Sequence, residues 1–185
     1  MPNETKSALD RLLRRYVANY ERVTGGLPTA EHEPAWPSPC EIGPPDADGR
    51  IHWQPRERDT AADFGGLERA LDMAIHPDIK SFYGSFWADN MELAAEEGGL
   101  TLIQVWNDDD FDRLAENIIG HAMAKQRVRS PLTVFIAVAD EGEFMLSVDN
   151  DTGSVVLEEP GSPPTREVAP TLAEFLDRLQ PAADE

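Results

Sequence analysis

The residues from Gly99 to Arg129 constrain the fold more than any other segment of the chain. An apolar and β-branched run, Leu100 to Trp106, stops at Asn107 and is followed by three aspartates and a long amphipathic sequence. Asparagine is a strong helix N-cap, and carboxylates in the first turn suit the positive end of the helix dipole. The segment therefore predicts a strand that leads directly into a helix with a strongly acidic N-terminus.

The acidity around this helix start has two interpretations. Capping requires one or two carboxylates, each contributing about 0.3–1 kcal/mol, and a solvated helix end needs nothing more. The local excess is larger, because further acidic residues precede the strand and follow on the helix: Asp89, Glu92, Glu96, Glu97, Asp112 and Glu116. We favour a binding surface over a merely solvated helix end, and the second interpretation remains the alternative.

The charge balance narrows the class of partner. The chain has 185 residues and a formal net charge of −19, with most of the acidic excess in its second half. Binding to a phosphate backbone needs a basic footprint, so nucleic acid is disfavoured, as is anionic lipid. A basic protein surface is the favoured partner, because an acidic face attracts it over about one Debye length.

Length and composition predict one soluble domain over residues 1–185, with a proline-rich surface loop at 27–50 and a frayed acidic tail at 181–185. Cys40 is the only cysteine, so an intramolecular disulfide and a cysteine-based zinc site are both excluded. No run approaches the roughly 18 apolar residues of a membrane span, and the N-terminus lacks the apolar stretch of a signal peptide. Any membrane association is therefore expected to depend on a partner.

Hydrophobic periodicity predicts the secondary structure. Helices are expected over 5–24, 64–73, 77–86, 108–125 and 172–179, ended or opened by residues such as Gly25, Pro77 and Thr171. Strands are expected over 51–53, at an edge, and over 90–95, 100–106, 132–139, 144–148 and 155–157, with a Gly98-Gly99 turn in the first hairpin. The fold class is α+β, a mostly antiparallel sheet of about five or six strands with helices packed mainly on one side.

Side-chain directions follow from the same patterns. Alternation puts Val134, Ile136 and Val138 on one face of their strand. Helical spacing puts Ala70 inside beside Leu67 and Leu71, and it puts the stem of Lys125 on the inner face of the long helix. His76, directly before a proline, is expected to be a loop or capping residue.

Catalytic and metal sites have little support in the sequence. The best isolated pair is Cys40 with His52, and the residue beside the thiol is Glu41, which opposes formation of a thiolate. The four histidines are far apart, and the acidic run Asp149 to Asp151 matches a β-turn better than a calcium loop. We expect neither a metal, nor a cofactor, nor an enzymatic reaction.

Several segments together resemble the Syd family of bacterial SecY-interacting proteins, in similar order and spacing over nearly the whole chain. The matching segments are PSPC (37–40), HWQP (52–55), LERALDMAIHPDIKSFYGSFWADNM (67–91), LTLIQVWNDDDFDRLAENIIGH (100–121), PLTVFIAV (131–138) and LAEFLDRLQP (172–181). The segment beginning at Leu67 also resembles the opening helices of a broader superfamily of cell-wall regulators and immunity proteins.

The resemblance implies a monomeric, non-enzymatic protein that binds the cytosolic loops of the SecY channel, loosely attached to the cytoplasmic side of the inner membrane. It implies a role in sensing or restraining uncomplexed or improperly assembled SecY. An immunity-type inhibitor of a basic toxin is the alternative. Local charge nominates the contact residues, with two tryptophans as aromatic anchors: Asp89, Glu92, Asp108, Asp109, Glu116, Trp87 and Trp106.

Overall fold

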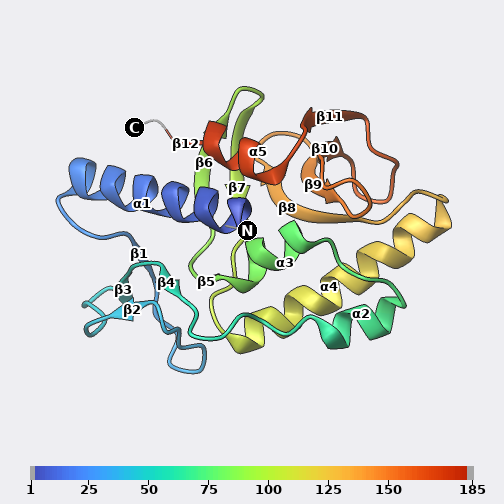
Figure 1. Cartoon of the computed structure of the whole chain (residues 1–185). Coiled ribbons are helices and arrows are strands. Elements are labelled where there is room, and N and C mark those ends of the chain that lie inside the picture. The colour runs from blue at the N-terminus through green and yellow to red at the C-terminus, as the bar shows by residue number, and fades with distance from the viewer. Residues whose placement is uncertain (1–2, 183–185) are drawn as a thin grey trace.

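A seven-stranded antiparallel sheet forms the centre of the structure, a computed structural model that describes residues 3–182 (Figure 1). The strand order is β11-β10-β9-β8-β7-β6-β12. The α+β class is therefore confirmed, with more strands than expected in the described residues. The strands are β6 (Met91–Ala95), β7 (Gly98–Leu102), β8 (Thr133–Ala139), β9 (Met145–Asp149), β10 (Val155–Glu158), β11 (Arg166–Ala169) and β12 (Gln180–Pro181).

Five helices in the described part of the chain pack against this sheet and against one another. They are α1 (Glu4–Thr24), α2 (Gly65–Leu71), α3 (Pro77–Gly84), α4 (Asp108–Arg127) and α5 (Leu172–Arg178). Helix α1 contacts α3, α5 and β12, whereas α4 lies against β8 and α2 (Figure 1). The first helix and the last strand of the chain are therefore in contact, and α1 lies beside the edge of the sheet that β12 completes.

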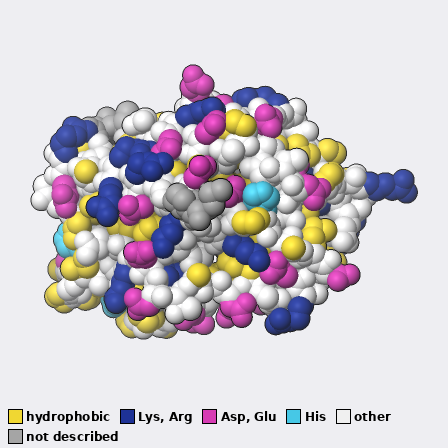
Figure 2. All heavy atoms as spheres, viewed as in Figure 1, with side chains coloured by type: hydrophobic (Ala, Val, Ile, Leu, Met, Phe, Trp, Pro, Cys, Tyr) yellow, Lys and Arg dark blue, Asp and Glu magenta, His cyan; other side chains and the backbone are white. Residues whose placement is uncertain are grey.

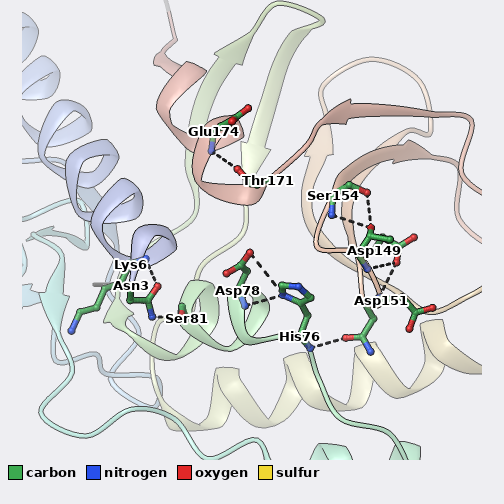
Figure 3. Close-up of polar contacts among 12 residues, drawn as sticks. Asn3, Lys6, His76, Asp78, Ser81, Asp149, Asp151, Ser154, Thr171 and Glu174 are labelled. Carbon is green, nitrogen blue, oxygen red and sulfur yellow. Dashed lines mark hydrogen bonds and ion pairs between the residues drawn. The ribbon is translucent and has the colours of Figure 1, made fainter. Parts of the chain in front are cut away.

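The helix boundaries follow from the capping residues expected from the sequence. The side chain of Asn107 accepts a hydrogen bond from the backbone N–H of Asp110, and Thr171 accepts one from Glu174. Gly25 ends α1 in the left-handed conformation, with φ of 81°. His76 caps α3 by accepting from the N–H of Asp78 (Figure 3). These predictions are confirmed, because each cap is chemistry between residues close in sequence.

The proline-rich segment is more ordered than expected. It contains β1 (Thr29–Glu31) and β2 (Glu41–Ile42), which flank β3 (Arg50–Trp53) in a small antiparallel sheet. The prediction of an edge strand at 51–53 is wrong, because β3 is the central strand. Both short strands fall between the prolines and keep their backbone donors, which allows the pairing. A further two-stranded sheet pairs β4 (Arg56–Glu57) with β5 (Phe86–Trp87).

The first hairpin differs from the prediction at both of its ends. Its two-residue turn is Glu96-Glu97, because Ala95 pairs with Gly98, and the glycines lie in β7. Strand β7 stops at Leu102, so residues 103–106 do not extend it. The N–H of Gln104 instead donates to the side chain of Asn90, which turns this connection toward the start of α4.

Two side-chain directions were predicted wrongly. The register of β8 against β9 shifts between Phe135 and Ala137, and this bulge reverses the alternation after Ile136. Val138 is consequently 49% exposed, whereas Val134 and Ile136 are buried. Ala70 is exposed, because α2 ends one residue later, at Leu71, and the buried residue of this short helix is Leu67.

Strands β11 and β12 lie where the sequence indicated connections and a tail. Arg166–Ala169 pairs with β10, and Gln180–Pro181 pairs with β6. Pro181 therefore belongs to the sheet and not to a frayed tail, and residues 183–185 of that predicted tail lie outside the described residues. Within the described residues, no helix combines the length and the apolar character needed to cross a membrane.

A buried polar network joins α4 to β10. Lys125 is 1% exposed, and its Nζ donates to Glu158 Oε1 at 2.5 Å and to the Ser162 carbonyl at 2.8 Å. The hydroxyl of Thr133 donates to Glu158 Oε2 at 2.6 Å. His121 Nε2 lies 3.0 Å from that hydroxyl, and burial lowers the pKa of His121. The sequence predicted only the stem of Lys125 at the interior; the structure places its charge there as well.

Candidate functional site

A hollow of about 460 Å³ lies between β1, the proline-rich segment, the Asp89-Asn90 turn and the start of α4. We call it the acidic hollow. Its charged lining consists of three carboxylates and one guanidinium: Glu31, Asp89, Asp110 and Arg50. Trp36, Trp106 and Gln104 form other parts of its wall. The excess of carboxylates gives the hollow a negative field that favours a cationic group.

Of the three aspartates at the start of α4, one takes part in capping the helix and two do not. Asp110 accepts a hydrogen bond from the backbone N–H of Trp106 at 2.9 Å, while its own N–H is held by Asn107. Asn107 also donates to the Pro37 carbonyl at 2.9 Å, which ties the helix to the proline-rich segment. Asp108 and Asp109 are exposed on the same turn. Capping therefore accounts for one of these three aspartates.

Asp89 is the most perturbed carboxylate of the acidic hollow. It is half-buried, and its Oδ1 accepts from the N–H of Asn90 at 2.9 Å. Burial raises the pKa of Asp89, and the hydrogen bond from Asn90 opposes this effect. The nearby charge of Asp110 raises the pKa further, whereas the charge of Arg50 lowers it. The protein holds two like charges close together here, and a cation between them would lower their repulsion.

Two tryptophans line the acidic hollow: Trp106, which was predicted from the sequence, and Trp36, which was not. Trp106 is 8% exposed, donates its indole N–H to the Trp36 carbonyl at 3.3 Å, and packs edge-on to Trp53. Trp36 is half-buried, and the guanidinium of Arg113 lies 4.3 Å from its ring centre. A lone tryptophan among prolines and polar residues was the available signal for Trp36.

Five of the seven nominated contact residues lie outside the lining of the acidic hollow, and three of these are also away from the first turn of α4. Trp87, on β5, is half-buried and covered by the guanidinium of Arg58 at 4.0 Å. Glu92 is exposed on β6 and lines a separate depression of about 200 Å³ beside α1. Glu116 is exposed two turns along α4. The structure thus brings Asp89 and Trp106 together, with Asp108 and Asp109 on the neighbouring helical turn.

The face shown in Figure 2 carries acidic and basic side chains intermixed. Exposed basic side chains of the protein pair with carboxylates in several places, as Arg11 does with Asp177 at 2.9 Å and Arg14 with Asp10 at 3.1 Å. Paired surface charges cancel at a distance, so they add little to the field that a partner meets. The candidate site is consequently defined by the lining of the acidic hollow and not by the net charge of the chain.

Cys40 is poorly suited to nucleophilic chemistry. It is buried, and burial raises the pKa of its thiol to about 12, opposed by weaker hydrogen bonds from Ser38 and the backbone of Arg56. His52 lies 3.1 Å from the Leu27 carbonyl through its Nδ1 and is exposed. The pair therefore lacks the thiolate and the adjoining base that a cysteine nucleophile requires.

We expect the native thiol of Cys40 to react with an aromatic disulfide reagent at least 100-fold more slowly than the thiol of the unfolded chain. The protonated, inaccessible thiol is the reason. Absorbance of the released thiolate, recorded with and without urea, measures both rates. Equal rates would show that the β2 region opens readily and that the burial of Cys40 does not protect it.

The acidic turn after β9 is a backbone turn. Asp149 Oδ1 accepts from the N–H of Asp151 (Figure 3). It also accepts from the N–H of Thr152, and the N–H of Gly153 donates to the Asp149 carbonyl. The predicted turn is present, but its backbone hydrogen bond joins residues four positions apart, as in an α-turn, and is one residue longer than the bond of a β-turn. Across residues 3–182, no group of three or more histidine, cysteine or acidic side chains is arranged to hold a metal ion.

Comparison with known proteins gives the family. A family model described as Syd protein (SUKH-2) matches residues 6–181. The Protein Syd of Pseudoalteromonas atlantica is 39% identical over 183 residues, covering 98% of each chain. The Protein Syd of Colwellia psychrerythraea is 38% identical, covering 90% of this chain and 87% of that relative. A Shewanella Protein Syd is 42% identical, covering 94% of this chain and 81% of the relative.

These matches extend over α1 through β12, including every element that lines the acidic hollow. Identities near 40% over nearly whole chains require a shared fold. The resemblance found in the sequence is confirmed, and the chain belongs to the Syd family.

Proposed function

We propose that this protein binds the basic cytosolic loops of the SecY channel through the acidic hollow. The observation that carries the proposal is the placement of Glu31, Asp89 and Asp110 around one cavity that contains a single opposing charge, Arg50. Membership of the Syd family supports SecY as the partner. Cytosolic loops of membrane proteins are rich in lysine and arginine, so their charge is complementary to the hollow.

In this proposal the exposed Asp108 and Asp109 extend the contact beyond the hollow, and Trp106 and Trp36 supply its apolar wall. Rim charges of this kind mainly raise the association rate and make it sensitive to salt, whereas groups inside the hollow determine how long the complex lasts. Binding is the whole activity proposed here, without a chemical step.

The biological role that we propose is recognition of SecY that is uncomplexed or improperly assembled. Loops that other channel subunits normally cover would then be free for the acidic hollow. The protein would reside on the cytoplasmic side of the inner membrane only through this contact, because its acidity opposes direct attraction to anionic lipid. A monomer presents one such hollow.

The experiment is capture of SecY in nanodiscs by two matched double variants. Glu31→Gln with Asp89→Asn removes two charges from the acidic hollow and is expected to weaken binding about 30-fold, since each exposed or partly buried charge contributes about 1 kcal/mol. Glu92→Gln with Glu116→Gln removes the same charge from exposed positions outside it. We expect this second variant to bind like the wild type.

Salt and subunit composition complete the test. Wild-type binding is expected to fall steeply between low and physiological ionic strength, and to be stronger for SecY alone than for the assembled channel. Equal weakening by the two double variants would show that SecY binds a diffuse acidic surface and not the acidic hollow. No capture of SecY, together with protection of cells from a co-expressed basic toxin, would favour the immunity-type alternative.

A further inference from the structure

Among the described residues, strand β1 is paired on one side only, with β3, and so forms one edge of its small sheet. Just before this pairing, the N–H of Trp53 donates to the Pro28 carbonyl at 3.0 Å. In an antiparallel pair, residues whose backbone groups face the neighbouring strand alternate with residues whose groups face away. Two positions after Pro28, Ala30 therefore directs its N–H and carbonyl toward β3, whereas Thr29 and Glu31 direct theirs away from it.

Three of these outward backbone groups lack a partner. The fourth, the Thr29 carbonyl, accepts from the guanidinium of Arg50 at 2.9 Å. The N–H of Thr29 and the N–H and carbonyl of Glu31 have no hydrogen-bond partner in the described part of the chain. We call these three groups the free edge of β1. Thr29 is half-buried and Glu31 is exposed, so an incoming strand finds unpaired donors and an acceptor there.

The acidic hollow lies along the free edge. All three residues of β1 line the hollow. The side chain of Ala30 packs against the core, and the side chains of Thr29 and Glu31 project from the opposite face of the strand. A single cavity that borders all three residues passes along one edge of the strand, and β3 occupies the other edge. The free edge is therefore part of the wall of the hollow.

We propose that an extended, basic segment of the partner adds to β1 as a fourth strand of the small sheet. This rests on the proposed function and adds the conformation in which the channel loop is bound. Backbone hydrogen bonds to Thr29 and Glu31 hold such a segment whatever its side chains are. The carboxylates in the lining, Asp89 and Asp110 with that of Glu31, then favour lysine or arginine among those side chains.

The first test uses two peptides capped at both ends, Lys-Thr-Lys-Thr-Lys and Glu-Thr-Glu-Thr-Glu. Solvent exchange of single backbone amides of the wild type is measured by NMR with and without each peptide. A saturating amount of the lysine peptide is expected to slow the exchange of the Thr29 and Glu31 amides by about tenfold or more. The Ala30 amide, which β3 already protects, should change less. The acidic peptide is expected to protect none of them.

The second test removes one donor of the free edge. Glu31→Pro deletes an N–H that points away from β3, and proline is tolerated at such an edge position, so the pairing of β1 with β3 remains. Glu31→Gln removes the charge and keeps the N–H. We expect Glu31→Pro to bind SecY in nanodiscs about tenfold more weakly than Glu31→Gln, because it loses a hydrogen bond and its ring obstructs the added strand.

The matched control is Glu57→Pro on β4. The N–H of the next residue, Arg58, donates to the Ser85 carbonyl, so the N–H of Glu57 also points away from its neighbouring strand. The substitution makes the same change of charge and backbone outside the lining of the acidic hollow. We expect Glu57→Pro to bind SecY like the wild type.

The outcomes distinguish this inference from the proposed function. Unprotected Thr29 and Glu31 amides, equal protection by the acidic peptide, or equal binding of Glu31→Pro and Glu31→Gln would each overturn the added strand. Capture of SecY by the wild type would still support the proposed function in those cases. If Glu31→Pro does not fold, the exchange measurement on the wild type decides. Protection by the lysine peptide without capture of SecY would reject only the proposed function.

Discussion

Replacing Lys125 by methionine is expected to lower the free energy of unfolding by about 3–5 kcal/mol, a large share of the stability of a domain of this size. Methionine fills a similar volume, so the loss comes from charge and not from a cavity. Without Lys125 Nζ, the fully buried Glu158 keeps its negative charge with the Thr133 hydroxyl as its hydrogen-bond donor and His121 Nε2 3.7 Å away. The Ser162 carbonyl also loses its donor.

The control is the double variant Lys125→Met with Glu158→Leu. Removing both charges removes the desolvation cost together with the attraction, so the double variant is expected to be more stable than Lys125→Met alone. Urea unfolding followed by tryptophan fluorescence measures all three proteins. A loss below about 1 kcal/mol in the single variant, or a double variant that is no more stable than the single, would show that water reaches Glu158 and that the pair is not isolated.

The same network shows where sequence reasoning is limited. Lys125 lies on the inner face of α4 by helical spacing, which the sequence predicts, but its partner Glu158 is on β10 and belongs to another part of the chain. A lysine at such a position usually buries its stem and keeps its ammonium in water. Only the approach of β10 to α4 reveals that the charge is compensated inside.

Elements defined by local chemistry were predicted well. The start of α4 at Asn107 and that of α5 at Thr171 depend on hydrogen bonds to residues three positions along the chain. Strand β12 and the bulge of β8 depend on pairing between distant segments, so the sequence around Pro181 and Val138 could not show them. Periodicity predicts an element, whereas its neighbours determine its register.

The residues of the candidate site were also predicted only in part from the sequence. Asp89 and Trp106 were nominated from the charges and aromatic residues around them, and both line the acidic hollow. Glu31 and Trp36 were missed, because they reach the hollow only through the pairing of β1 with β3 and the anchoring of the proline-rich segment on Asn107. Gln104, which also lines the hollow, was missed because a glutamine that follows a strand carries no signal of its own in the sequence.

Changing Asp89 to lysine is expected to weaken SecY binding about 100-fold or more. The substitution converts a lining of three carboxylates and one cation into two of each, so the hollow no longer attracts a cation. The new ammonium also lies in the same hollow as the two carboxylates that remain, Glu31 and Asp110, and competes with a cationic group of the partner for them. Unfavourable charge at the centre of an interface costs about 2–5 kcal/mol or more, which corresponds to this loss.

The stability of the Asp89 variants should change in the opposite direction from their binding. Because the pKa of Asp89 is raised in the folded protein, the ionised carboxylate opposes folding at neutral pH. Its contribution is most favourable at low pH, below the pKa of the unfolded chain, and is lost as the pH rises through the folded-state value. Asp89→Asn, which can still accept from the N–H of Asn90, should therefore be more stable than the wild type at pH 7.

Urea unfolding of Asp89→Asn and the wild type at pH 7 and at pH 4 measures this difference, which should shrink at the lower pH. A residue that lowers stability while supporting binding is typical of a functional site, where repulsion kept in the free protein is relieved by the partner. If Asp89→Asn instead loses stability at pH 7 and Asp89→Lys still binds SecY, the carboxylate has a structural role. The acidic hollow would then not be the place where the channel loop is held.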